Sequence, residues 1–306
     1  MARGWVCARR FSNPHASRLP YHLRRTDFGN TGIQAMHSRR ESPILLIHGL
    51  IGTLKDQRLF NALSGRTILA PDLYGYGRRQ RTATCNIAIP AQVELIRQTV
   101  CRECNGSRVH LVGHSVGAVV ACFFAHAWPD FVASIVSVEG NFSLKDAFWS
   151  ASVAKLTDDE ANKMLAEFCV DPVSWLKKSG VSGAPENVAM ASRWLGKQPG
   201  STVRRMADSV VRCTRLASYE QILREVFAMH AVHLVSGERS RGSWDIPAWA
   251  QENAASDSVL KNVGHLMMLE DAPGFSRIIS RITKGRRKGR NKNLAAPRLG
   301  RITPTS

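Results

Sequence analysis

Two continuous apolar runs near the start of the chain have the length and composition of buried strands. Residues 44–49 read ILLIHG and residues 67–73 read TILAPDL, and unbroken runs of this kind are typical of strands covered on both faces. Further strands are predicted at 109–112, 131–140, 231–237 and 258–265. Segments with helical potential separate most of these runs. Strands that alternate with helices predict an α/β fold with a doubly wound, mostly parallel sheet.

This alternation breaks between about residues 141 and 229, where one helical pattern follows another. Strand-like runs resume at residue 231, so the helical stretch is an insertion between two strands. The insertion predicts an all-helical cap, residues 142–229, over a core formed by residues 41–141 and 230–283. Its tryptophans are expected in the core of the cap, with the wall of a substrate site as the alternative.

The strong positive charge of the chain is confined to its two ends. The 306 residues include 42 Lys or Arg and 24 Asp or Glu, for a net charge of +18. Residues 1–40 hold eight Arg and one acid, residues 277–306 hold ten basic residues and no acid, and the segment between them carries +1. Residues 1–40 and 284–306 are therefore expected to be disordered, basic ends. Nonspecific attraction to polyanions follows from such ends, and no specific nucleic-acid partner is predicted.

Cysteine content and the N-terminal composition bear on the compartment. No apolar run reaches the ~18–20 residues of a membrane span. Seven cysteines, an odd number scattered through predicted core elements, favour reduced thiols and a cytoplasmic location. The first 25 residues are rich in Arg and lack acids, as organelle transit peptides do. An artefactual upstream extension of the reading frame explains them equally well, and both alternatives stay open. The oligomeric state is not predicted.

The pentapeptide from Gly113 to Gly117 carries the clearest chemical signal. It reads GHSVG, follows the β-branched run VHLV and precedes an apolar segment with helical potential. G-x-S-x-G between a strand and a helix is typical of a nucleophile elbow, a sharp turn that holds the serine Oγ clear of the sheet. The glycines are needed because strand and helix pass too close there for a Cβ.

Four segments together give the chain a family resemblance. They are HGLIG at 48–52, PDLYGYG at 71–77, GHSVG at 113–117 and VGHLMMLEDAP at 263–273. In this order and spacing, residues 43–283 resemble an α/β-hydrolase with a helical cap. The resemblance implies a serine hydrolase with a Ser-His-acid triad, and the joint match is far more specific than any one motif.

Ser115 is the expected nucleophile and His265 the expected base. A serine hydroxyl needs an adjacent base to accept its proton, and serine early with histidine late matches the family order. The developing oxyanion needs two preorganised N–H donors. The resemblance implies that these are the backbone amides of Val116 and Leu50, with Ile51 as the alternative to Leu50.

The acid of the triad is less clear. Most of the family carries it after the strand that follows the cap, but Ser240 stands where that aspartate is expected, with Glu238 nearby and Asp245 five residues beyond. Some relatives place the acid after the strand before the cap, where this chain has Glu139. A glutamate that closes an apolar strand has little structural reason to be there, so Glu139 is preferred and Asp245 is the alternative.

These patterns favour a hydrolase that cleaves a carboxylic ester, or a related acyl bond, through an acyl-enzyme. A C–C bond hydrolase on the same triad and a noncatalytic binding protein on the same fold are the alternatives. The sequence holds no metal-binding, P-loop or dinucleotide motif, so no cofactor and no metal are expected. The expected partner is a small acyl substrate, and its identity depends on the cap.

Overall fold

The computed structural model describes residues 41–284, so the predictions for residues 1–40 and 285–306 lie outside the described residues. Six strands form one sheet in which every neighbouring pair is parallel. In sheet order the strands are β2 (Ile68–Leu69), β1 (Ile44–Ile47), β3 (Val109–His114), β4 (Val132–Val138), β5 (Val232–Gly237) and β6 (Ser256–Leu260). The predicted doubly wound, mostly parallel sheet is confirmed.

The largest differences from the predicted strand limits are at the ends of β2 and β6. β2 stops after Leu69, two residues before Pro71, which has no N–H to donate to a neighbouring strand. β6 ends at Leu260 instead of running to His265, because Asn262 turns the chain with φ 58° and its N–H donates to the Glu238 carboxylate. His265 therefore lies in a loop after the sheet.

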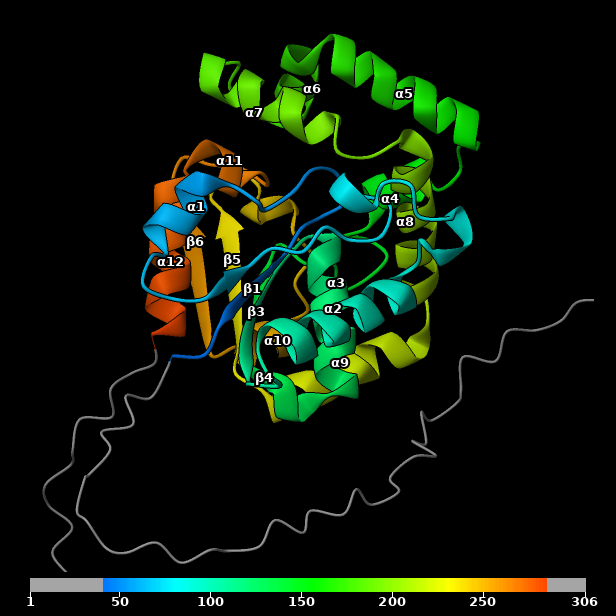
Figure 1. The fold of residues 1–306 in the computed structure, drawn as a ribbon. Coiled ribbons are helices and arrows are strands. Elements are labelled where there is room, and N and C mark those ends of the chain that lie inside the picture. The colour runs from blue at the N-terminus through cyan, green and yellow to red at the C-terminus, as the bar shows by residue number, and fades with distance from the viewer. Residues whose placement is uncertain (1–40, 285–306) are drawn as a thin grey trace, which may run out of the picture. The chain divides into compact units, whose positions relative to one another are not determined.

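Helices cover both faces of the sheet (Figure 1). On one side α1 (Gln57–Ala62) packs against α12 (Ala272–Thr283). On the other, α2 (Ile89–Glu103) and α3 (Val116–Ala127) pack together, and α3 also contacts α9 (Ala217–Met229). α10 (Ala248–Glu252) and α11 (Met267–Glu270) complete this part of the chain. Because both faces are covered, all four residues of β1 are buried, which explains their unbroken apolar run.

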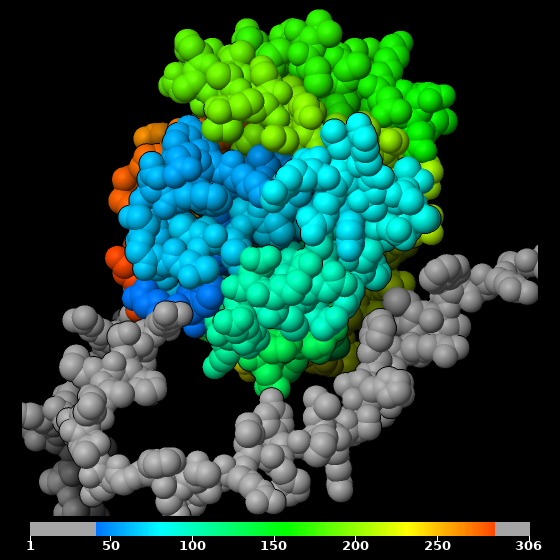
Figure 2. Space-filling model, in the orientation of Figure 1, coloured from blue at the N-terminus to red at the C-terminus, as the bar shows by residue number. Residues whose placement is uncertain are grey.

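Six helices lie between β4 and β5, as the helical stretch predicts. They are α4 (Phe148–Val153), α5 (Asp158–Val170), α6 (Pro172–Lys178), α7 (Pro185–Leu195), α8 (Gly200–Thr214) and α9. α5, α6 and α7 lie beyond the end of the sheet to which the strands point (Figure 1). In the space-filling view these green helices rest on the blue and cyan segments that follow β1 and β2 (Figure 2).

The last inserted helix belongs to the layer on the sheet. The rings of Phe123 on α3 and Tyr219 on α9 stack with centroids 5.6 Å apart, and the Tyr219 hydroxyl donates to the Asn141 carbonyl at 2.7 Å. Only part of the segment between residues 142 and 229 therefore lies over the strand ends.

The two ends of the described chain meet at Arg66. The Arg66 guanidinium donates to the Ser42 carbonyl at 2.6 Å and to the Thr283 hydroxyl, and its side chain is only 4% exposed. A buried guanidinium that loses its acceptors is costly. Both terminal segments therefore contribute to the stability of the domain.

We expect a fragment of residues 41–284 to fold cooperatively, because the described core lies between Ile44 and Ile279. A fragment of residues 44–282 lacks Ser42 and Thr283, and also Glu41, which pairs with Arg66 at 3.0 Å, and the Pro43 carbonyl, which accepts from the His110 N–H at 2.8 Å. It should lose about 2 kcal/mol or more of unfolding free energy, the scale of hydrogen bonds to a charged group. Urea unfolding followed by circular dichroism measures both. Equal stability of the two fragments would contradict the role given to Arg66.

Candidate active site

The carboxyl ends of three parallel strands bring the candidate residues together. The register pairs His114 at the end of β3 with Val138 at the end of β4, and Val138 with Val235 on β5. Ser115 and Glu139 each follow directly on these strand ends. In open α/β sheets this edge is where ligands bind. The parallel order thus places residues from distant parts of the sequence beside one another.

Ser115 occupies a sharp turn between β3 and α3. Its φ is 53° and its ψ is −122°, a conformation that is rare for a residue with a side chain. The turn is tight because α3 starts against β1: a Cβ on Gly117 would lie 2.2 Å from the Ile47 carbonyl oxygen. The strand–turn–helix context predicted for the pentapeptide is present.

The loop after β1 lies against this turn. A Cβ on Gly49 would lie 3.3 Å from the Ser115 Cβ, so the backbones are close. The Tyr76 hydroxyl donates to the Leu50 carbonyl at 2.9 Å, and the Gly52 N–H donates to Gln198 at 3.2 Å. Loop 48–52 is thus held on both sides, by the segment after β2 and by the connection between α7 and α8.

Glu139 is a buried carboxylate with three donors. It is 6% exposed, and its φ of 42° is left-handed, which costs a residue with a Cβ about 1–2 kcal/mol. One carboxylate oxygen lies 2.6 Å from Nδ1 of His265, and the other accepts from the Ser240 hydroxyl at 2.5 Å and the Gly237 N–H at 2.8 Å. An unfavourable backbone conformation and a buried charge at one residue point to a functional constraint.

The electrostatic environment determines which atoms of Glu139 and His265 carry a proton. Burial alone raises the pKa of Glu139, but the hydrogen bonds from His265, Ser240 and Gly237 outweigh it and leave the pKa below its usual range. The carboxylate is therefore ionised at neutral pH and accepts only. Nδ1 of His265 must then carry the hydrogen, so in the neutral ring Nε2 is the basic nitrogen.

His114, the residue before Ser115, ties His265 to the turn. Its Nε2 lies 3.0 Å from the His265 carbonyl oxygen, and the two rings lie 4.6 Å apart, tilted by 43°. Burial, with the nearby His265, places the pKa of His114 well below 6.5. The neutral ring adds no charge beside His265 and fixes its backbone.

A model of the alpha/beta hydrolase family matches residues 44–277. The chain belongs to this family. The fold agrees, since a thermophilic esterase from Thermogutta terrifontis superposes with a TM-score of 0.61 at 17% identity, over 79% of this chain and 89% of that one. MenH from S. aureus superposes with a TM-score of 0.63 at 18% identity, over 79% and 93%.

Sequence similarity to curated relatives is more local. Lipase 3 of Moraxella sp. (strain TA144) is 30% identical over 115 residues, which are 37% of this chain and 35% of the lipase. Lipase 1 of Psychrobacter immobilis matches to the same extent. The match thus covers about a third of the length of these relatives.

The alternative acids lie elsewhere in this α/β-hydrolase. Asp245 is half exposed, and its carboxylate lies 3.6 Å from the Lys145 ammonium, while its N–H donates to Asp146. Glu238 pairs with Lys261 at 2.6 Å. Ser240, which stands where most of the family has the acid, instead donates its hydroxyl to Glu139. This role of Ser240 was not predicted, although its place in the family pattern was the signal.

Between residues 41 and 284, no group of three or more His, Cys, Asp or Glu side chains is arranged to hold a metal ion. Within the same range no helix is both long and apolar enough to cross a bilayer.

His48 at the start of loop 48–52 makes stability sensitive to acid. Its ring is 2% exposed, and burial lowers its pKa from 6.5 to about 4. Below about pH 6.5 the unfolded chain binds a proton at this residue, whereas the folded chain does so only near pH 4. Between these values unfolding takes up a proton. The unfolding free energy therefore decreases as the pH is lowered, by up to about 1.4 kcal/mol per pH unit.

We expect the His48→Asn variant to lose less stability than the parent between pH 6.5 and pH 4. Urea unfolding at half-unit steps measures the difference between the two proteins, in which contributions from the carboxylates cancel. Parallel curves would show that His48 titrates normally in the folded state.

Proposed function

We propose that the chain is a serine hydrolase that cleaves a carboxylic ester or a related acyl bond through an acyl-enzyme. Ser115 is the nucleophile, His265 the general base and Glu139 the acid. The observation that carries the proposal is the 2.6 Å contact between the buried Glu139 carboxylate and Nδ1 of His265, whose backbone is tied to the residue before Ser115.

The first half-reaction forms the acyl-enzyme. The Ser115 Oγ attacks the acyl carbon while His265 Nε2 takes the hydroxyl proton. The carbonyl oxygen becomes an anion, which the backbone N–H groups of Val116 and Leu50 stabilise, with Ile51 as the alternative to Leu50. As the intermediate collapses, the imidazolium returns the proton to the departing alkoxide, and the alcohol leaves.

The second half-reaction repeats these steps with water. His265 Nε2 takes a proton from water, whose oxygen attacks the acyl carbon and regenerates the oxyanion. Collapse breaks the bond to the Ser115 Oγ, which recovers its proton from the imidazolium, and a carboxylic acid leaves. Water is the only co-reactant, and no cofactor enters the balance.

Glu139 stabilises the imidazolium in both halves. Its charge is desolvated, so its attraction to the protonated ring is stronger than at an exposed site. The donors Ser240 and Gly237 occupy one oxygen and direct the other towards His265. Carboxylate and ring therefore need little reorganisation when the charge forms.

Ester chemistry and a helical cap are supported by the relatives and by the insertion. The similar proteins include lipases and an esterase, and these names favour carboxylic esters over other acyl substrates. Within the segment between residues 142 and 229, we assign α5, α6 and α7, which lie over the strand ends, as the cap. In this proposal the cap selects the acyl substrate, because fold alone does not determine specificity.

We expect Ser115→Ala to abolish labelling by a fluorophosphonate and to lower kcat on p-nitrophenyl esters by about 10⁴-fold or more, since a triad acts as a unit. The Ser137→Ala variant is a matched control, because Ser137 is a buried serine on β4 with no proposed role. Near-normal turnover by folded Ser115→Ala would remove the serine-hydrolase proposal.

The acid is tested by Glu139→Gln against Asp245→Asn. The glutamine keeps the shape but not the charge, so kcat should fall about 10⁴-fold, the loss that follows neutralisation of a triad acid. Asp245→Asn should stay close to the parent. Circular dichroism confirms folding of both variants before the kinetics are compared.

A second carboxylate position sharpens this test. Ser240 and His265 both contact the Glu139 carboxylate, so adding Ser240→Asp to the Glu139→Gln variant should recover part of the lost kcat. If Asp245→Asn loses most of its kcat while Glu139→Gln keeps it, the acid of the triad lies after the cap. If neither variant loses activity, His265 works as a dyad with Ser115.

A further inference from the structure

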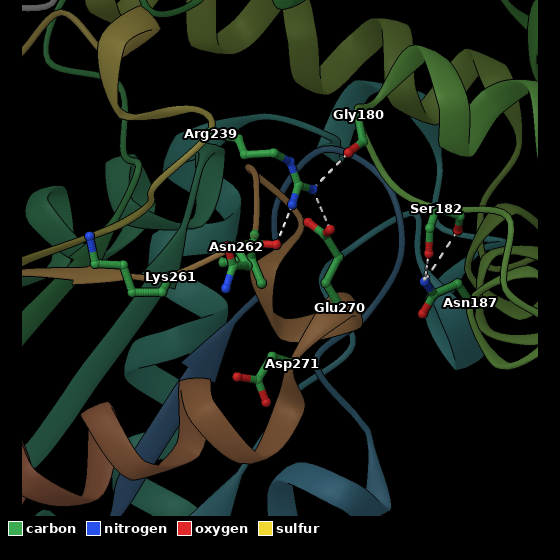
Figure 3. Close-up of a pocket in the computed structure, with 9 residues that line it drawn as sticks. Gly180, Ser182, Asn187, Arg239, Lys261, Asn262, Glu270 and Asp271 are labelled. Atoms are coloured by element: carbon green, nitrogen blue, oxygen red, sulfur yellow. Dashed lines mark hydrogen bonds and ion pairs between the residues drawn. The ribbon is translucent and has the colours of Figure 1, made fainter.

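Arg239 contacts three other segments of the chain (Figure 3). It follows β5, and its guanidinium donates to the Asn262 carbonyl in the loop after β6 and to the Glu270 carboxylate on α11. The same side chain donates to the Gly180 carbonyl at 2.7 Å, in the connection between α6 and α7. A planar guanidinium suits this task because its five donors point in fixed directions.

Glu270 connects Arg239 to the loop that contains His265. One oxygen of its carboxylate accepts from Arg239, and the other accepts from the Gly264 N–H at 2.7 Å. Gly264 directly precedes His265 in the chain. In addition, the backbone N–H of Arg239 donates to the Val263 carbonyl at 2.9 Å. The backbone on the N-terminal side of His265 is thus held by the Arg239–Glu270 pair.

The connections on both sides of α7 form hydrogen bonds with the core. At the connection between α7 and α8, the Gly52 N–H donates to Gln198 and the Gly77 N–H donates to the Lys197 carbonyl at 2.7 Å, while Trp194 packs on Gly52. At the connection between α6 and α7, Arg239 reaches Gly180 beside an open, polar hollow of about 540 Å³.

We propose that Arg239 and Glu270 are positioning residues. They hold His265 in the position needed for catalysis and couple that position to the position of the helices α6 and α7 on the core. The inference rests on the proposed role of His265 as the general base. Neither residue touches the substrate in this proposal. They act through the backbone from Asn262 to Gly264.

The expected effect is on turnover more than on stability. The ion pair is partly open to water, with the Arg239 side chain 43% and the Glu270 side chain 10% exposed, and ion pairs that water reaches contribute little to the free energy of unfolding. A base displaced by about 1 Å costs on the order of 10²-fold in rate. Loss of the pair should therefore lower kcat while the protein stays folded.

The test compares Arg239→Gln, Glu270→Gln and their double variant with Lys261→Met as a matched control. Lys261, in the loop after β6, forms an ion pair with Glu238, in the loop after β5. Among the described residues it forms no hydrogen bond or ion pair with Gly264 or Gly180. For each protein, fluorophosphonate labelling, kcat and KM on p-nitrophenyl acetate, the melting temperature and amide hydrogen exchange are measured.

We expect Arg239→Gln and Glu270→Gln each to lower kcat by about 10- to 100-fold, with KM changed by less than about threefold. The double variant should lose little more than one single variant, because the residues act as a pair. Amide hydrogen exchange should become faster at residues 262–265 in both single variants, and at residues 179–182 in Arg239→Gln. Arg239→Lys should recover part of the rate, and Lys261→Met should behave like the parent.

Two results would overturn the inference: parental kcat in both glutamine variants, or faster exchange spread evenly over the whole chain with a lower melting temperature. Failure of the proposed function looks different. In that case the parent itself resists fluorophosphonate and turns over no ester, and the exchange at 262–265 and 179–182 still decides whether Arg239 holds the two loops.

Discussion

The buried carboxylate of Glu139 is the constraint around which the strand-end side of the molecule is arranged. A charge in this place is costly unless several donors face it, and here a backbone amide, a hydroxyl and an imidazole do so. These donors come from the end of β5, from the turn after it and from the loop after β6. Satisfying one carboxylate therefore fixes three loops relative to one another.

Rigid elements supply the precision that such an arrangement needs. Ser115 and Glu139, which both have a positive φ, each follow directly on a central strand. Strands buried on both faces have little freedom to shift, because their neighbours are close-packed. The backbone conformations of Ser115 and Glu139 can therefore persist, since the sheet on one side and the following segment on the other hold them in place.

Much of the fold could be predicted from local patterns. The unbroken apolar runs identify the strands because both faces of the sheet are covered, and the helical spacing identifies most helices. The helices α6, α10, α11 and α12 were not predicted individually, and the first three have only four to seven residues, too few for a clear period. The end of β6 was also missed, because the turn at Asn262 depends on a side chain from another loop.

For the candidate site, the sequence by itself determined what depends on neighbours along the chain. The turn at Ser115 is one example, because its glycines, strand and helix are contiguous. Tertiary structure decided the partner of His265, since Glu139 lies 126 residues away and only the order of the strands brings the two together. The contacts of Arg239 with Gly180 and Glu270, and of Glu270 with Gly264, were also invisible in the sequence. A hydrogen bond between distant residues depends on position in space, and no local pattern of residues encodes it.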